Sequence, residues 1–158
     1  MVEVTVKINA GDLYDYMLMH TYNSAAGLLG SGVGALLVVY AIATKNWLFL
    51  VLGAIMLLYL PWTLFIKSRR QILSNAAFAE PLHYILNEEG LTVSQGDASE
   101  QMAWQDMHKA VSTPKSLILY TSPVNASIFP KKDLGEKTAG VIGIISTHMP
   151  PKKVKIRS

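Results

Sequence analysis

Cysteine is absent from the sequence, and its absence excludes disulfide bonds, thiolate metal sites and cysteine nucleophiles. The sequence also lacks a glycine-rich phosphate-binding loop, a Gly-x-Ser-x-Gly nucleophile elbow and a His-Glu-x-x-His zinc motif. With 158 residues, the chain has room for one small soluble domain of roughly ninety residues beside a membrane segment. We therefore expect a protein that is not an enzyme and that holds no cofactor and no metal ion.

Charged residues are missing from two long stretches, 24–43 and 47–66, although 16% of the whole sequence is charged. Each stretch is long enough, at about 1.5 Å per residue, to cross the roughly 30 Å hydrocarbon core of a bilayer as a helix. Only residues 44–46 connect them, so the two helices must form an antiparallel hairpin. A buried hairpin in a soluble protein is the alternative, but soluble helices of this length normally carry a polar stripe. The sequence therefore predicts a transmembrane hairpin over residues 24–66.

Basic residues are distributed unevenly around this hairpin. Lys67, Arg69 and Arg70 follow the second stretch directly, whereas the connecting loop holds only Lys45. Because Lys and Arg beside a span mark its cytoplasmic side, we expect these three residues to anchor the hairpin at the cytoplasmic surface. Two spans then place both termini in the cytoplasm.

Small residues recur in the first span at Ala26, Gly30 and Gly34, and this spacing places them on one helix face. Such a face permits the close approach of a neighbouring helix. The second span offers Gly53 as the partner. A homodimer through the same face is the alternative.

The first 23 residues are predicted to form a strand and a helix. Residues 2–8 alternate between apolar and polar side chains, which is the pattern of a half-buried strand. A strand needs a sheet, and the candidate sheet follows the hairpin, so we expect the strand to join that sheet. Asp12 is predicted to cap a helix that starts at Leu13 and runs into the first span.

Beyond the hairpin, residues 67–80 are predicted to form a linker helix and residues 81–158 a small domain. Short apolar segments separated by turn residues predict an antiparallel β meander in this domain. Asp133 and Glu136 have the spacing of a capping box for a closing helix. The fold class predicted for the whole chain is an α+β membrane protein. The expected strands are 82–86, 91–94, 100–104, 108–113, 117–121 and 126–129, with a further strand near 154–157.

Several motifs of the domain occur in a recognisable order, with Glu88-Glu89-Gly90-Leu91 first, then Trp104, then Phe129-Pro130-Lys131. Preceded by a two-span hairpin, they make the chain similar to the YcxB-like family of bacterial membrane proteins. The resemblance implies a hairpin in the bacterial inner membrane and a cytoplasmic domain of pleckstrin-homology (PH) type, with an antiparallel sheet capped by a C-terminal helix. It implies no settled activity. Trp104 is also expected in the core, because its indole can bury a large apolar area.

Two groups of ionisable residues could support chemistry. Asp106 and His108 could lie on one face of a strand and supply two metal ligands or an acid/base pair, but a zinc site needs a third ligand. Asp12, Asp15 and His20 could handle protons near the membrane. The spacing of Asp15 and His20 turns them away from one another on a helix, which argues against this reading.

Two basic clusters lie near the C-terminus. They could bind anionic lipid headgroups, at roughly 1 kcal/mol per charge near a membrane surface, or contact a protein partner. Solubilising charge is the alternative. Nucleic-acid binding is not expected, because the clusters lack interleaved aromatic residues and the net charge is only +3. The clusters are Lys131 and Lys132, and Lys152, Lys153, Lys155 and Arg157.

These observations favour a non-enzymatic membrane protein whose cytoplasmic PH-like domain binds a protein or lipid partner at the membrane surface, as a scaffold or regulator. One alternative is an accessory or immunity-type subunit that acts through its transmembrane hairpin on another membrane protein. A second alternative is an enzyme or metal protein that uses Asp106 and His108.

Overall fold

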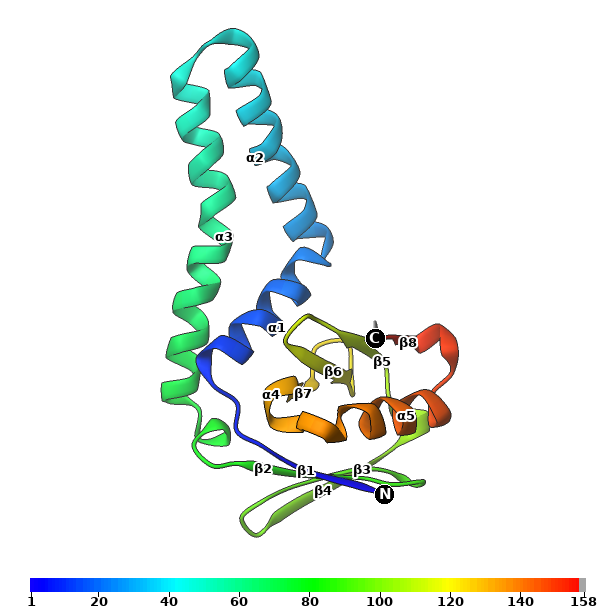
Figure 1. Cartoon of the computed structure of the whole chain (residues 1–158). Helices are drawn as coiled ribbons and strands as arrows, with labels where there is room; N and C mark the ends of the chain where they lie inside the picture. The colour runs from blue at the N-terminus through cyan, green and yellow to red at the C-terminus, as the bar shows by residue number, and fades with distance from the viewer. Residues whose placement is uncertain (157–158) are drawn as a thin grey trace.

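The computed structural model describes residues 1–156 and shows two long helices that stand on a β-rich domain (Figure 1). The helices α2 (Ala25–Thr44) and α3 (Trp47–Ser74) form the predicted antiparallel hairpin. Lys45 closes α2 in the left-handed region, with φ of 53°. The side chain of Asn46 then accepts a hydrogen bond from the Leu48 amide and starts α3.

Both helices are long and apolar enough to cross a membrane. Only 17% of the most apolar window of α2, and 6% of that of α3, is buried within the chain. A core helix of a soluble protein would instead be mostly buried. These helices expose large apolar side chains along their length, among them Leu36, Val39, Ile55 and Leu58. The pair therefore fits a membrane protein.

The helix α1 (Ala10–Tyr22) precedes the hairpin and meets α2 at an angle (Figure 1). Its N-cap is Asn9, whose side chain accepts from the Asp12 amide at 2.9 Å, while the Asp12 carboxylate accepts from the Asn9 amide at 3.0 Å. The prediction that Asp12 caps a helix from Leu13 was wrong, because Asp12 is the third helical residue of this capping box.

The predicted continuous run of α1 into the first span was also wrong. The helix α1 ends at Tyr22 with Asn23 as its C-cap, and Ser24 caps α2 by accepting from the Gly27 amide at 3.1 Å. The corner depends on Gly27, because a Cβ there would collide with the carbonyl group of Thr21. Glycine thus permits the close backbone approach by which the chain changes direction as it enters the span.

The domain contains two four-stranded sheets within the described residues. The first has the order β1-β2-β3-β4 and is antiparallel throughout, so the N-terminal strand joins the sheet that follows the hairpin, as predicted. The second has the order β7-β6-β5-β8, in which β8 runs parallel to β5. The strands are β1 (Val2–Val6), β2 (Leu82–Leu86), β3 (Gly90–Gln95), β4 (Ala98–Ala103), β5 (Lys109–Ser112), β6 (Ser116–Tyr120), β7 (Ala126–Pro130) and β8 (Val154–Lys155).

One apolar core lies inside this domain and receives side chains from both sheets. The helix α5 (Thr138–His148) closes the core and buries Val141 and Ile145 in it. The fold is therefore α+β, as predicted, and sheets closed by a C-terminal helix are compatible with a PH-like type. The strand residues of this core include Val4, Val6, Tyr84, Leu86, Leu91, Leu117, Leu119 and Phe129.

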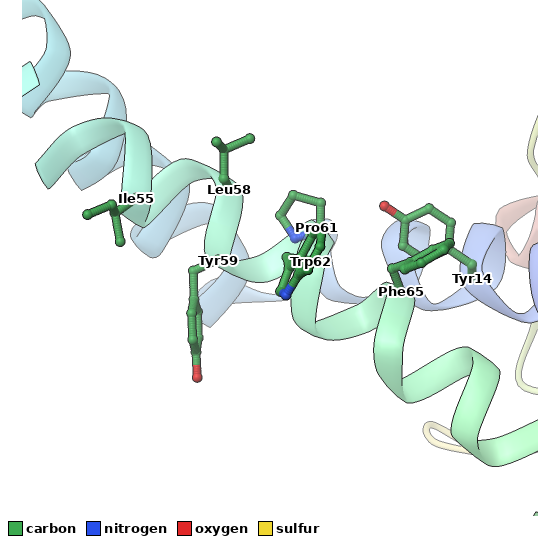
Figure 2. A pocket seen from close by; sticks show the side chains of 7 residues that line it. All are labelled: Tyr14, Ile55, Leu58, Tyr59, Pro61, Trp62 and Phe65. Carbon is green, nitrogen blue, oxygen red and sulfur yellow. The ribbon is translucent and has the colours of Figure 1, made fainter. Parts of the chain in front are cut away.

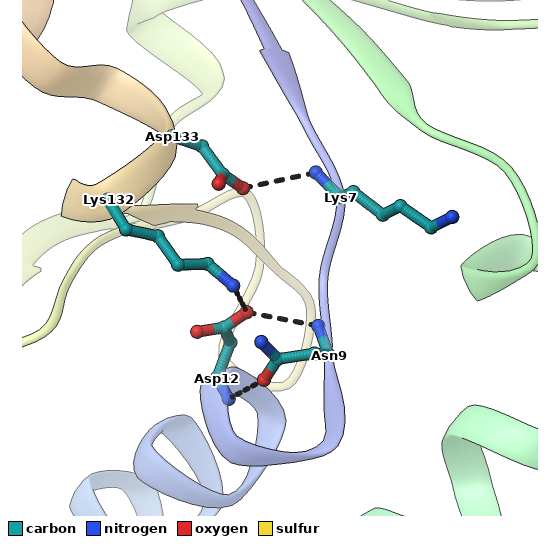
Figure 3. A network of polar contacts seen from close by, with 5 residues as sticks. All are labelled: Lys7, Asn9, Asp12, Lys132 and Asp133. Atoms are coloured by element: carbon teal, nitrogen blue, oxygen red, sulfur yellow. Dashed lines mark hydrogen bonds and ion pairs between the residues drawn. The ribbon is translucent and has the colours of Figure 1, made fainter.

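The predicted capping box of Asp133 and Glu136 was wrong. The helix α4 (Lys131–Leu134) begins directly after Pro130, without a side-chain cap, and Gly135 at φ of 52° separates it from α5. The Asp133 carboxylate is instead used in a long-range contact, because it accepts a hydrogen bond from the Lys7 amide at 3.1 Å (Figure 3).

The linker predicted over residues 67–80 is only partly helical. Its first half is the end of α3, which stops at Ser74. Asn75 is extended, and its side chain accepts from the Ala77 amide at the start of a 3₁₀ turn, Ala76–Phe78. The asparagine ends the helix by offering the backbone this local alternative.

Candidate functional site

The polar residues of α1 attach this helix to the domain, and the resulting junction is the candidate functional site. At the start of α1, the buried carboxylate of Asp12 pairs with the Lys132 ammonium of α4 at 2.7 Å (Figure 3). The same carboxylate oxygen accepts the Asn9 amide of the capping box. Asp12 therefore ties the first turn of α1 to a helix that follows it by more than a hundred residues.

The middle of α1 holds the turn between β5 and β6. The Thr113 hydroxyl donates to the Asp15 carboxylate at 2.5 Å and accepts from the Ser116 amide at 2.9 Å. Thr113 is buried, so this charge-assisted hydrogen bond is shielded from water. It fixes the second turn of α1 against the domain.

The end of α1 packs on Tyr120, the last residue of β6. His20 Nδ1 lies 3.0 Å from the Tyr120 hydroxyl, and the Tyr16 ring lies beside the same tyrosine. Burial raises the pKa of the Tyr120 phenol well above its ordinary value, because the phenolate would lose its hydration there. Asp12, Asp15 and His20 thus each meet a different partner, and the structure does not bring them together as a proton-handling group.

A hollow of about 560 Å³ opens beside this contact, between the α1–α2 corner and the strands β5 and β8. We call it the junction hollow. Lys109 contributes its ammonium group, which lies 4.5 Å from the centre of the Tyr120 ring. Residues that line the hollow include His20, Asn23, Ser24, Lys109, Tyr120 and Lys155.

A second hollow, of about 610 Å³, lies on the other side of α1, against α3 (Figure 2). Tyr14 meets Phe65 there edge to face, with ring centroids 5.7 Å apart. Its lining is apolar and aromatic, with Pro61 and Trp62 at its centre. This contact joins α1 to the second span. Since other residues of α1 contact the domain, α1 connects the hairpin to the domain.

Residues 86–140 match the model of the YcxB-like protein family. This segment is similar to that family. The match confirms the predicted resemblance and covers the domain from the end of β2 into α5, without β1 or the hairpin. Searches of curated proteins and of solved structures found no match to the chain.

The motif residues of the YcxB-like segment are structural. Trp104 is 5% exposed, donates its indole N–H to the Asn87 carbonyl at 2.9 Å and stacks on the His148 ring. It lies in a 3₁₀ turn, Trp104–Asp106, immediately after β4 rather than in the predicted strand. Phe129 is fully buried, and its ring packs on Tyr84.

The turn from β7 into α4 completes this motif. Pro130 is buried at the end of β7, where its fixed φ suits the entry into a helix. The next residue, Lys131, donates its amide to the Lys115 carbonyl at 2.8 Å.

Among the predicted headgroup-contact residues, some make contacts within the domain and others are exposed. Lys132 pairs with Asp12, and Lys153 donates its ammonium to the Met107 carbonyl at 2.8 Å, so both serve the fold. Lys152 and Lys155 are exposed. Lys131 is half-buried, and Arg157 lies outside the described residues.

The predicted cytoplasmic anchor lies on the last turns of α3. Lys67, Arg69 and Arg70 are all exposed there. The Arg69 guanidinium lies over the Phe65 ring, 5.2 Å from its centre. This contact holds one positive charge at the end of the apolar surface of the span.

The predicted small-residue face of α2 packs against α3 at Gly34 but not at Gly30 or Ala26. A Cβ on Gly53 would lie 2.9 Å from the Gly34 carbonyl oxygen, and one on Gly34 would lie 3.0 Å from Leu57, so these glycines permit close packing of α2 and α3. Gly30 has no neighbouring atom within 4 Å of its would-be Cβ, and Ala26 is exposed. The physical reason is that α1 packs against both α2 and α3 near this end of α2.

Asp106 and His108 are both exposed, on either side of the buried Met107. Within residues 1–156, no three His, Asp or Glu side chains lie close enough to hold a metal ion. The pair therefore lacks the third ligand that a zinc site needs.

Sequence reasoning missed the domain-side partners Thr113, Lys109 and Tyr120, and it missed Gly27. The spacing of Asn9 and Asp12 did contain a signal, because an N-cap residue and an acidic residue three positions later form a capping box. The partners on the domain had no such local signal.

Proposed function

We propose that the chain is a non-enzymatic protein of the bacterial inner membrane whose PH-like domain binds a protein or lipid partner at the membrane surface, as a scaffold or regulator. The observation that carries this proposal is the attachment of α1 along the domain through Asp12, Asp15 and His20. Because α1 also contacts α3, the domain is not free to swing on a linker. A domain held in this way presents a fixed surface at a fixed distance from the bilayer.

The proposed orientation has both termini in the cytoplasm. Lys67, Arg69 and Arg70 are exposed at the domain end of α3, whereas Lys45 is the basic residue of the opposite turn. This asymmetry supports a cytoplasmic domain by the positive-inside rule.

The apolar hollow at Pro61 and Trp62 favours a second candidate function (Figure 2). An accessory or immunity-type subunit would present such a surface to another membrane protein, and an aromatic side chain of the partner could fill it. In this candidate the hairpin, rather than the domain, carries the function.

Exchange of the spans separates the two candidates. Residues 28–62 are replaced by an unrelated two-span hairpin, which removes Pro61 and Trp62 and keeps Gly27, Phe65 and the domain. Proteins are crosslinked in cells and identified after extraction in mild detergent. Capture of the same partner by the parent and the exchanged chain supports the proposed function. Loss of that partner supports the second candidate.

A matched variant tests the domain itself. Trp104→Ala disrupts the core of the domain and leaves the spans unchanged, so under the proposed function it should lose the partner. A Trp104→Ala chain whose domain is unfolded, as judged by proteolysis, and that still captures the partner would contradict the proposed function.

A further inference from the structure

The junction hollow lies where the chain enters its first span. Asn23 is the C-cap of α1, Ser24 is the N-cap of α2, and both residues line the hollow. Because the apolar run of α2 begins at the next residue, this side of the hollow lies at the level of the lipid headgroups. The opposite side is formed by β5 and β8 of the domain.

The register of β5 and β8 directs two lysines to the same place. Val111 pairs with Lys155 in the parallel ladder, so their side chains share a face of the sheet. Lys109 lies two residues before Val111 and therefore points to that face as well. All three residues line the junction hollow.

The charge of the lining is of one sign. Lys109 and Lys155 are cationic, and the imidazole of His20 also lines the hollow. No Asp or Glu is among the lining residues. The ammonium of Lys109 already lies over the Tyr120 ring, which orients it without neutralising it. Lys132 and Lys153, by contrast, are engaged elsewhere in the domain.

We propose that the junction hollow binds the phosphate of an anionic phospholipid headgroup, with Lys109 and Lys155 as its two cationic contacts. Compact ammonium groups suit a phosphate as point charges. The lipid would enter sideways from the leaflet and leave its acyl chains in the bilayer beside α2. The inference rests on the proposed placement of the domain at the membrane surface, and it names the ligand class and the site.

Native mass spectrometry of the full-length protein in a mild maltoside detergent tests this site. The probes are dioleoylphosphatidylglycerol, which is anionic, and dioleoylphosphatidylcholine, which is zwitterionic. We expect one phosphatidylglycerol to be retained in preference to phosphatidylcholine. Each Lys→Gln change should weaken retention about fivefold, the factor that corresponds to roughly 1 kcal/mol per basic residue near a membrane surface. Lys109→Gln with Lys155→Gln should weaken it about 25-fold on the same scale.

Lys152→Gln is the matched control, because it removes the same charge from an exposed residue that does not line the hollow. Retention by this variant should equal that of the parent. Equal retention of the two lipids overturns the proposal in favour of non-selective adhesion of lipid to the apolar surface. A loss in Lys152→Gln equal to that in the hollow variants overturns it in favour of diffuse attraction by surface charge. Inorganic phosphate at the same concentration should not displace the lipid. Displacement would assign the hollow to a soluble phosphate instead.

Two further variants guard against misfolding. Lys155 is exposed, so Lys155→Gln alone should fold and show the fivefold loss. Lys109→Arg with Lys155→Arg keeps both charges and should retain the lipid, and a folded variant that loses it overturns the proposal. The measurement needs neither a protein partner nor a given orientation in cells, so its failure and that of the proposed function are distinguishable.

Discussion

Replacement of Trp104 should reveal how strongly the core of the YcxB-like segment depends on one side chain. The indole is 5% exposed, and its ring stacks on His148 with centroids 5.6 Å apart. Truncation of a buried tryptophan to alanine costs about 3 to 5 kcal/mol, because apolar burial is lost and a cavity remains. Trp104→Ala should therefore lower the free energy of unfolding of the domain by that amount.

Two milder substitutions separate the contributions of the indole hydrogen bond and of the ring contact to this cost. Trp104→Phe keeps an aromatic ring but leaves the Asn87 carbonyl without the indole N–H that donates to it at 2.9 Å, which should cost about 1 to 3 kcal/mol. His148→Ala removes only the ring stacked on the indole, which should cost about 0.5 to 1.5 kcal/mol beyond the lost area. The order of destabilisation should be Trp104→Ala, then Trp104→Phe, then His148→Ala.

Pulse proteolysis of the full-length protein in detergent, over a urea series, measures these changes. The protease cleaves domains that have unfolded, so the urea midpoint reports on the domain rather than on the spans. A Trp104→Ala midpoint equal to that of the parent would show that the indole does not stabilise the core. Trp104 would then more readily be explained by a role in binding than by a role in the core.

Three other changes test separate parts of the structure. Deletion of residues 2–8 should lower the urea midpoint of the domain markedly, because burial of Val4 and Val6 in β1 stabilises the domain by roughly 1.5 kcal/mol or more each. An unchanged midpoint would refute the pairing of β1 with β2. Burial raises the pKa of Tyr84 to about 12, so its stabilising contribution is complete below pH 10 and is lost as the pH rises towards 12; Tyr84→Phe should show a smaller alkaline loss of stability than the parent. Gly53→Val should weaken the hairpin in a detergent-denaturation titration, whereas Gly30→Val should not, and equal effects would contradict the observed packing of α2 on α3.

The elements that could be predicted from sequence are those with local signals. Uncharged length identified the two spans, and strict alternation identified β1 together with its need for a sheet. The strand 82–86 was predicted with its observed bounds, because turn residues border it on both sides. In each case the signal lies within the segment or directly beside it, and it does not depend on contacts with distant residues.

The parts that could not be predicted depend on tertiary contacts. The polar residues Asp12 and His20 have partners more than 90 residues away, and a single sequence contains no trace of such pairing. The corner at Gly27 was missed because the residues around it suit a continuous helix as well as two helices. The pair of lysines at the junction hollow appears only when the parallel pairing of β8 with β5 is known.

Labelling of single cysteines in intact cells tests most directly whether the domain is cytoplasmic, on which the proposed function depends. The natural sequence has no cysteine, so each variant reports on one position alone. Asn46 lies in the hairpin turn and Glu136 lies in the domain, and both residues are exposed. With a membrane-impermeant thiol reagent, Asn46→Cys should react and Glu136→Cys should react only after the cells are opened. Reaction of Glu136→Cys in intact cells, with Asn46→Cys protected, would place the domain outside and contradict the account.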